Sequence, residues 1–200
     1  MAESGARAWL AEAERIDRAV YGAVAATPAP HLDVAMRRLS RAANYSKLSL
    51  AASALLASAG GRSGRRAARS GLACVATTSA FVNLVVKPFA RRRRPDRATV
   101  GVPLERHVGL PSSASFPSGH TAAAIAFATG AGRVLPVAGI PLHALSALVA
   151  YSRVHTGVHY PGDVMAGVVI GAVLADVTTG VMSHASSSAR ARTCRREAAV

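Results

Sequence analysis

The sequence predicts an all-α protein, a membrane-embedded bundle of about five to six helices. Hydrophobic residues make up 50% of the 200 residues and aromatic residues only 4%, so the apolar residues are mainly Ala, Val, Leu and Gly. Small side chains of this kind let helices pack closely. No linker rich in Pro, Gly or Ser divides the chain, which indicates a single domain.

The first part of the chain, residues 1–45, is expected to form amphipathic helices. Between Ala6 and Ala26, apolar residues recur at helical spacing opposite charged residues. A Thr-Pro-Ala-Pro stretch ends this helix, and a second amphipathic stretch covers residues 32–43. Both helices could lie on a membrane surface or pack against the bundle.

The bundle itself is expected within residues 46–182. Its apolar segments are Leu48–Gly60, Leu72–Val86, Thr121–Gly132, Val134–Tyr151 and Val164–Met182. Only the last approaches the roughly 20 residues that cross a bilayer core unaided. We therefore expect an integral protein of the cell membrane, built from marginal helices that bundle together, with a soluble helical protein as the alternative. Residues 183–200 are rich in Ser, Ala and Arg and are expected to form a disordered basic tail.

The net charge of +14 restricts the partners that we expect. In a soluble protein this charge would suggest nucleic acid. Here the cations lie between apolar segments, and the interleaved aromatic residues that stack on bases are missing. The charge favours a bilayer, with anionic lipids in it, and no nucleic acid. The oligomeric state stays open.

Three short segments carry residues suited to a phosphate site. They are Lys87 to Arg94-Pro95, then Pro117-Ser118-Gly119-His120, and finally Ser152-Arg153 with His159 and Asp163. An apolar segment ends at the first, another begins at the second, and a pair of segments returns the chain to the third. This topology places all three segments at one end of the bundle.

Phosphate carries negative charge that cations and N–H donors can stabilise. Lys87, Arg94 and Arg153 are the candidate cations, since arginine offers a planar fork and lysine a point charge. Ser118 and Gly119 precede an Ala-rich helical segment, so their backbone N–H groups are expected at a helix N-terminus, where anions bind. In the alternative interpretation, Ser118 is only a helix N-cap.

Other polar residues near these segments have plainer interpretations. Arg91 to Arg93 form a charge run that we interpret as solvated or bound to lipid headgroups. Ser112, Ser113 and Ser115 are expected in a polar loop over the site, with no chemical role assigned.

Asp163 is expected to orient an imidazole. Pro161 favours the first position of a helix, so Asp163 falls in the first turn and can reach back to His159. That hydrogen bond would fix the tautomer and leave the other ring nitrogen free. A rival interpretation is a metal site, because His155 is spaced by four from His159, which is spaced by four from Asp163. Gly157 and Pro161 argue against a continuous helix there, so neither a metal nor another cofactor is expected.

Together the segments resemble the signature motifs of the type 2 phosphatidic acid phosphatase superfamily, written K-x6-R-P, P-S-G-H and S-R-x5-H-x3-D. Every fixed position is met without substitution. The resemblance implies a haloperoxidase-like core and a metal-independent phosphatase. It implies that His159 is the nucleophile that forms a phosphohistidine and that His120 protonates the leaving oxygen. By the same resemblance the third catalytic residue is Asp163, and the phosphate-binding residues are Lys87, Arg94, Ser118, Gly119 and Arg153.

The substrate implied by this resemblance is a lipid phosphate monoester or pyrophosphate, such as phosphatidate, phosphatidylglycerol phosphate or a polyprenyl phosphate. The Arg-rich first motif and S-R-V-H-T-G-V-H-Y-P-G-D are also similar to the phosphatase half of fused phosphatase and diacylglycerol-kinase-like proteins. Two alternatives remain. One is a soluble acid phosphatase or vanadate-dependent haloperoxidase-like enzyme, and the other is a non-catalytic basic protein that binds a membrane surface or nucleic acid.

Overall fold

The computed structural model describes the backbone of residues 2–197 and the side chains of residue 5 and residues 8–188. This part of the chain forms eight α-helices, which confirms the predicted all-α class. They are α1 (Ala2–Ala26), α2 (Pro30–Ala42), α3 (Lys47–Ala59), α4 (Gly61–Phe81), α5 (Arg97–Val100), α6 (Gly119–Val134), α7 (Pro136–His155) and α8 (Pro161–Glu197). Three short helical turns join them, namely η1 (Asn44–Ser46), η2 (Val82–Val86) and η3 (Leu104–Arg106).

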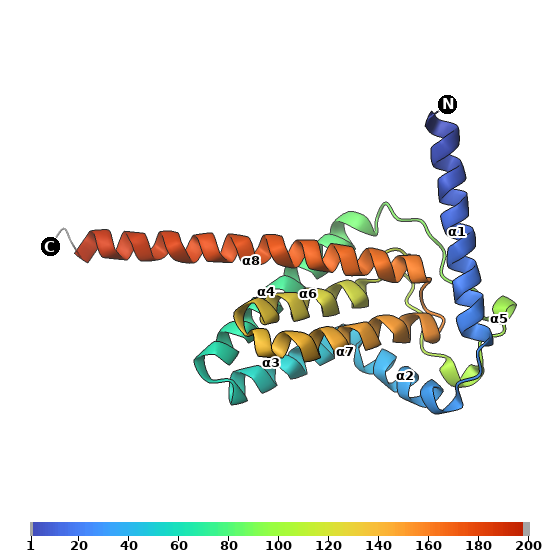
Figure 1. The fold of residues 1–200 in the computed structure, drawn as a ribbon, viewed down its shortest axis with the longest axis horizontal. Helices are drawn as coiled ribbons and strands as arrows, with labels where there is room; N and C mark the ends of the chain where they lie inside the picture. The colour runs from blue at the N-terminus through green and yellow to red at the C-terminus, as the bar shows by residue number, and fades with distance from the viewer. Residues whose placement is uncertain (1, 198–200) are drawn as a thin grey trace.

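Five helices make up the bundle, namely α3, α4, α6, α7 and α8 (Figure 1). Helix α6 packs against α4, α7 and α8, and α3 packs against α4. Glycine allows these close approaches. A Cβ atom at Gly130 of α6 would lie 2.5 Å from Cys74 Sγ of α4, and one at Gly171 of α8 would clash with the carbonyl oxygen of Ala122. The small residues noted in the composition therefore lie where helices cross.

Three stretches of helix are long and apolar enough to cross a membrane: Gly61–Val86, Pro136–His155 and Pro161–Ser188. Judged by its apolar segment alone, only the last of these approaches that length. The difference arises at the helix ends, because α4 already begins at Gly61, within an arginine-rich stretch, and α7 continues to His155. Apolar runs alone underestimate such helices.

Helix α8 continues well past the bundle (Figure 1). It ends at Glu197, so the expectation of a disordered tail is wrong for residues 183–197, which are helical. Residues 198–200 lie outside the described residues. No Gly or Pro follows Gly180 to interrupt the helix, and Ala and Arg are good helix formers.

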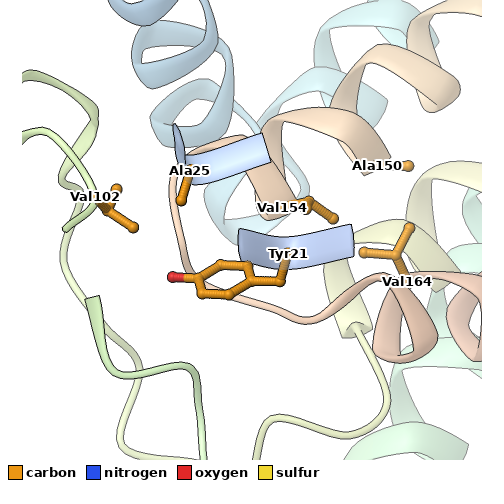
Figure 2. Packing of buried hydrophobic residues seen from close by; sticks show 6 residues of the cluster. All are labelled: Tyr21, Ala25, Val102, Ala150, Val154 and Val164. Atoms are coloured by element: carbon orange, nitrogen blue, oxygen red, sulfur yellow. The ribbon is translucent and has the colours of Figure 1, made fainter. Parts of the chain in front are cut away.

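Helix α1 packs against the end of the bundle where α8 begins, while its first turns extend away (Figure 1). Its residues Tyr21 and Ala25 form a buried cluster with Ala150 and Val154 of α7 and Val164 of α8 (Figure 2). Of the two arrangements that the sequence left open, this half of α1 packs against the bundle.

Helix α2 is held to the same end by buried polar contacts. Asp33 accepts a hydrogen bond from Arg106 Nε at 2.7 Å and lies 2.8 Å from His155 Nε2. Arg106, which is fully buried, also donates to the carbonyl oxygens of Val24 and Thr27. A buried charge is stable only when it is paired in this way. The N-terminal helices are thus built into the molecule beside the three motif segments.

Candidate active site

His159 and Asp163 lie at the junction between α7 and α8. Helix α7 ends at His155, and Gly157 turns the chain with a φ of +67°, which favours glycine. His159 is held in this turn because its N–H donates to the carbonyl of Arg153 at 3.1 Å. Asp163 then falls in the first turn of α8, and its Oδ2 is 3.5 Å from His159 Nδ1. Their positions agree with those expected from the sequence.

The carboxylate of Asp163 is fixed on several sides. Its Oδ2 accepts hydrogen bonds from Ser115 Oγ at 2.5 Å and from the N–H of Tyr160 at 2.9 Å. Its Oδ1 pairs with Arg92 Nη1 at 2.9 Å. Because Asp163 is fully buried, these contacts hold its charge beside Nδ1 of His159.

Arg94 lies on the other side of the imidazole. Its Nη1 is 3.3 Å from His159 Nε2 and donates to the carbonyl of Val158 at 3.0 Å. The rest of the guanidinium is held by carbonyl oxygens of the loop that precedes α6, at Pro111, Ser113 and Ala114. The fork therefore faces the ring nitrogen that Asp163 does not contact.

Lys87, Gly119 and His120 line a cleft of about 170 Å³ beside this pair. Lys87 follows the π-helical turn η2, where its N–H reaches back to Val82, and its Nζ lies 3.2 Å from Ser113 Oγ. Such turns inside helices often occur at functional sites. Nε2 of His120 lies 3.0 Å from Oδ1 of Asn44. The cleft thus brings a lysine, a helix start and a histidine together.

Ser118 lies at the start of α6, as the sequence suggested, but its N–H is already bonded. Its backbone N–H donates to the carbonyl oxygen of Asp163 at 2.9 Å, so the expectation that it is a free anion donor is wrong. Its hydroxyl accepts from Thr121 Oγ1 at 3.0 Å without capping the helix. Ser118 therefore joins the start of α6 to the start of α8, while Gly119 begins α6 next to Lys87.

Arg153 is almost completely buried between the bundle and α2. Its Nη1 donates to the carbonyl oxygen and to Oγ of Ser40, at 2.9 and 2.8 Å. Its Nε has no hydrogen-bond partner within the described part of the chain. A buried arginine N–H without a partner is costly, and an anion at this position would satisfy it.

The electrostatics of the two histidines favour an anion as well. Burial, and then the nearby Arg94 and Arg153, lowers the pKa of His159 to about 4, although Asp163 acts in the opposite direction. Burial, with Arg153 as the strongest charged neighbour, lowers the pKa of His120 to about 3. The pKa of Lys87 is lowered by burial and by Arg94. Excess positive charge of this kind is relieved when a phosphate binds.

The residues of the rival metal interpretation face different partners. His155 is directed at Asp33, whereas His159 is beside Asp163. Among the described residues, no group of three His, Cys, Asp or Glu side chains could hold a metal ion.

Sequence reasoning missed three contributors. Arg92 is paired with Asp163, so its assignment to a solvated charge run is wrong, and Ser115 is bonded to Asp163 although no role was assigned to it. Asn44 contacts His120 from a segment remote in sequence. In the amino-acid sequence alone, no feature distinguishes Arg92 from its neighbours Arg91 and Arg93.

The chain is similar in sequence to several known proteins. Residues 69–186 match the family model of the PAP2 superfamily. The chain is 39% identical over 115 residues to decaprenylphosphoryl-5-phosphoribose phosphatase of Mycobacterium tuberculosis, covering 54% of this chain and 59% of that protein. It is 42% identical over 88 residues to the Mycolicibacterium smegmatis protein of the same name, covering 42% of this chain and 43% of that protein. The matches thus span about half the length of these curated relatives.

Two solved structures share the fold. One is a transmembrane PAP2 type phosphatidylglycerolphosphate phosphatase from Bacillus subtilis, with a TM-score of 0.65 and 25% identity. The match covers 86% of this chain and 87% of that one. The other is LpxE of Aquifex aeolicus, with a TM-score of 0.64, 24% identity, and coverage of 80% and 92%. The shared transmembrane fold and the three membrane-length helices make this an integral membrane protein. Because the family model matches residues 69–186 and all three motifs lie at one end of the bundle, the chain belongs to the PAP2 superfamily.

Proposed function

We propose that the chain is a metal-independent lipid phosphatase that works through a phosphohistidine at His159. The observation that carries the proposal is the placement of this imidazole, with Nδ1 beside Asp163 and Nε2 beside Arg94. A proton on Nδ1 leaves the lone pair on Nε2, where Arg94 can hold the phosphoryl oxygens. His159 is buried, and His120, which lines the neighbouring cleft, lies near enough to it for the two charges to interact.

The reaction needs two displacements. Nε2 of His159 attacks phosphorus, the bond to the lipid oxygen breaks, and that oxygen takes a proton from His120. Water then attacks the phosphohistidine, His120 accepts the proton of that water, and the nitrogen–phosphorus bond breaks to release inorganic phosphate. Asp163 stabilises the imidazolium without taking its proton, as the aspartate of a serine triad does.

The remaining cations suit the phosphate itself. Lys87 and Arg153 both lie near enough to His120 to lower its pKa, which places positive charge on that side of the site. Gly119 begins α6 at the same cleft. We propose that these three bind phosphoryl oxygens together with Arg94, and that Ser118 supports the site through its bond to Asp163.

The substrate that we favour is a polyprenyl-phosphosugar phosphate, because the curated relatives are named decaprenylphosphoryl-5-phosphoribose phosphatases. The cleft beside His120 is also lined by Leu48 of α3, Ala124 of α6 and Val149 of α7. These apolar residues suit the first part of a lipid tail while its phosphate stays at the cations. Phosphatidylglycerol phosphate is the next candidate, from the name of the Bacillus relative.

The basic surface is proposed to contact anionic lipids of the bilayer and not nucleic acid. The similarity to the phosphatase half of fused phosphatase and diacylglycerol-kinase-like proteins supports the same reaction class. It adds no kinase activity to this chain.

The test is phosphate release by detergent-purified protein, with EDTA present, from a panel of lipid phosphates. We expect release by the wild type and a loss of about a thousandfold or more in His159→Ala, because the nucleophile is removed. His120→Ala is expected to lose about a hundredfold or more, as general acids contribute on that scale. His143→Ala is the matched control, since His143 is exposed and contacts Thr129 away from the motif segments. No release from any lipid, or equal release by all variants, would refute the proposal.

A further inference from the structure

We propose that Asp17, on α1, is a positioning residue for the His159–Asp163 pair and acts on it through Arg92. The inference rests on the proposed function, because it concerns the same catalytic pair. Asp17 lies outside residues 69–186, the part of the chain that matches the family model, whereas the catalytic pair lies inside it.

The contact chain is direct. Oδ2 of Asp17 pairs with Arg92 Nη2 at 2.5 Å, and Nη1 of the same guanidinium pairs with Oδ1 of Asp163 at 2.9 Å. The side chain of Asp17 is 8% exposed, that of Arg92 26%, and that of Asp163 is fully buried. One arginine fork therefore bridges two buried carboxylates from helices that are remote in sequence.

Asp17 also contacts the turn that carries the pair. Its Oδ1 accepts a hydrogen bond from the N–H of Gly162 at 2.6 Å. A Cβ atom at Gly162 would lie 3.0 Å from Asp17 Oδ2, so glycine permits this close approach. The first turn of α8, where Asp163 lies, is thus held by α1 as well as by α6.

Aromatic contacts keep the bridge in place. The guanidinium of Arg92 lies over the ring of Tyr160, 4.4 Å from its centroid. That ring meets Tyr21 of α1 edge to face at 5.4 Å, and Tyr21 belongs to the cluster that packs α1 onto the bundle (Figure 2). The bridge is therefore a fixed part of the α1 contact and not a loose surface pair.

The electrostatic consequence follows from the sharing of Arg92. Asp17 partly neutralises this cation, so Asp163 keeps more of its negative charge for the imidazolium that forms at His159. Without the charge of Asp17, the positive charge of Arg92 offsets more of the negative charge of Asp163. The imidazolium of His159 is then less stable. The groups that face the pair are Arg92 and Arg94 from the loop after η2, Arg153 from α7, His120 from α6, and Asp17 from α1.

Asp17→Asn tests the charge of Asp17 separately from its hydrogen bond, because the amide oxygen can still accept from the N–H of Gly162. We expect kcat to fall about tenfold with KM unchanged, within the range of coupling between contacting residues. The acid limb of kcat/KM should move to lower pH, since the less compensated Arg92 disfavours protonated His159. Arg92→Gln should move the same limb to higher pH. In the Arg92→Gln background, Asp17→Asn should have little further effect on kcat.

The control is Glu14→Gln, which removes a carboxylate of the same helix whose partner is the exposed Arg18. It should leave kcat, KM and the pH profile unchanged. Wild type and His159→Ala are assayed alongside, so that a chain without His159-dependent phosphatase activity refutes the proposed function and is distinguished from a failure of this inference.

Three outcomes would overturn the inference while the wild type remains active. They are a wild-type kcat in Asp17→Asn, an unmoved acid limb, or an equal loss of kcat with and without Arg92. If Asp17→Asn does not fold, Arg92→Lys decides, because lysine keeps the charge but cannot bridge both carboxylates. The inference then predicts a lower kcat at unchanged KM, and a wild-type kcat would refute it.

Discussion

The two nitrogens of His159 have opposite environments, and this asymmetry governs the site at the residue scale. Nδ1 faces a carboxylate that is held by Ser115, Arg92 and a backbone N–H, whereas Nε2 faces Arg94. The first environment fixes the proton, and the second keeps the opposite nitrogen among cations. Rigid support of this kind lets a histidine act as a nucleophile.

The pH dependence of kcat/KM follows from these surroundings. Because the pKa of His159 is lowered to about 4, its imidazole stays unprotonated as the pH falls from 7 toward 5, and attack is lost only near pH 4. His120, with a pKa of about 3, is unprotonated in the free enzyme at neutral pH. The proton that His120 gives to the leaving oxygen must then enter with the substrate, as a phosphate monoanion that passes it to His120 and whose second pKa is about 6.

We therefore expect an acid limb near pH 4 and an alkaline limb that follows the ionisation of the substrate. The measurement is kcat/KM between pH 3.5 and 9, on substrates whose phosphate groups differ in pKa, because kcat/KM reports the free enzyme and free substrate. An acid limb at the ordinary histidine pKa would contradict this expectation. So would an alkaline limb whose position does not change with the pKa of the substrate phosphate.

The positions of site residues can be predicted from the sequence where the local backbone restricts the residue type. The pattern around His159 and Asp163 predicted a turn followed by a helix, and their positions follow from Gly157 and Pro161. Arg92 could not be predicted, because its role depends on Asp17, which approaches only once α1 has packed. Asn44 is a similar case, since its contact to His120 depends on the placement of η1.

At the scale of elements, the contact between α6 and α8 sets the distance between two motif segments. His120 lies in the first turn of α6 and Asp163 in the first turn of α8. Gly167 and Gly171 of α8 lie directly against the backbone of the first turns of α6. Apolar periodicity predicted both helices but not their ends, because helices extend into polar residues that packing or capping stabilises.

Gly171→Ala is expected to destabilise the bundle by about 1 to 3 kcal/mol, because its Cβ would collide with the backbone of Ala122. Gly180→Ala, on the same helix, has nothing within 4 Å of the added Cβ and should stabilise it by about 0.5 to 1 kcal/mol through lower backbone entropy. Thermal unfolding in detergent measures both. Equal shifts in the two variants would contradict the close contact between α6 and α8.

At the scale of the whole molecule, α1, α2 and the loop that precedes α6 enclose the end of the bundle where the three motifs meet (Figure 1). The motif order along the chain was enough to predict that they meet at one end. The enclosure was not predictable, because the two amphipathic helices suit a membrane surface as well as a protein surface. Asp33 and Arg106 show the difference, since the two pair with each other in a buried contact that forms only when α2 packs onto the bundle.

The proposed mechanism requires that His159 becomes covalently phosphorylated during turnover. It is tested most directly by mixing the purified protein with a lipid substrate that carries a radiolabelled phosphate and quenching in alkali, in which phosphohistidine survives. We predict label on the peptide that contains residue 159 in the wild type, and none in His159→Ala. Turnover by the wild type without a labelled peptide, or label on a different residue, would contradict the account.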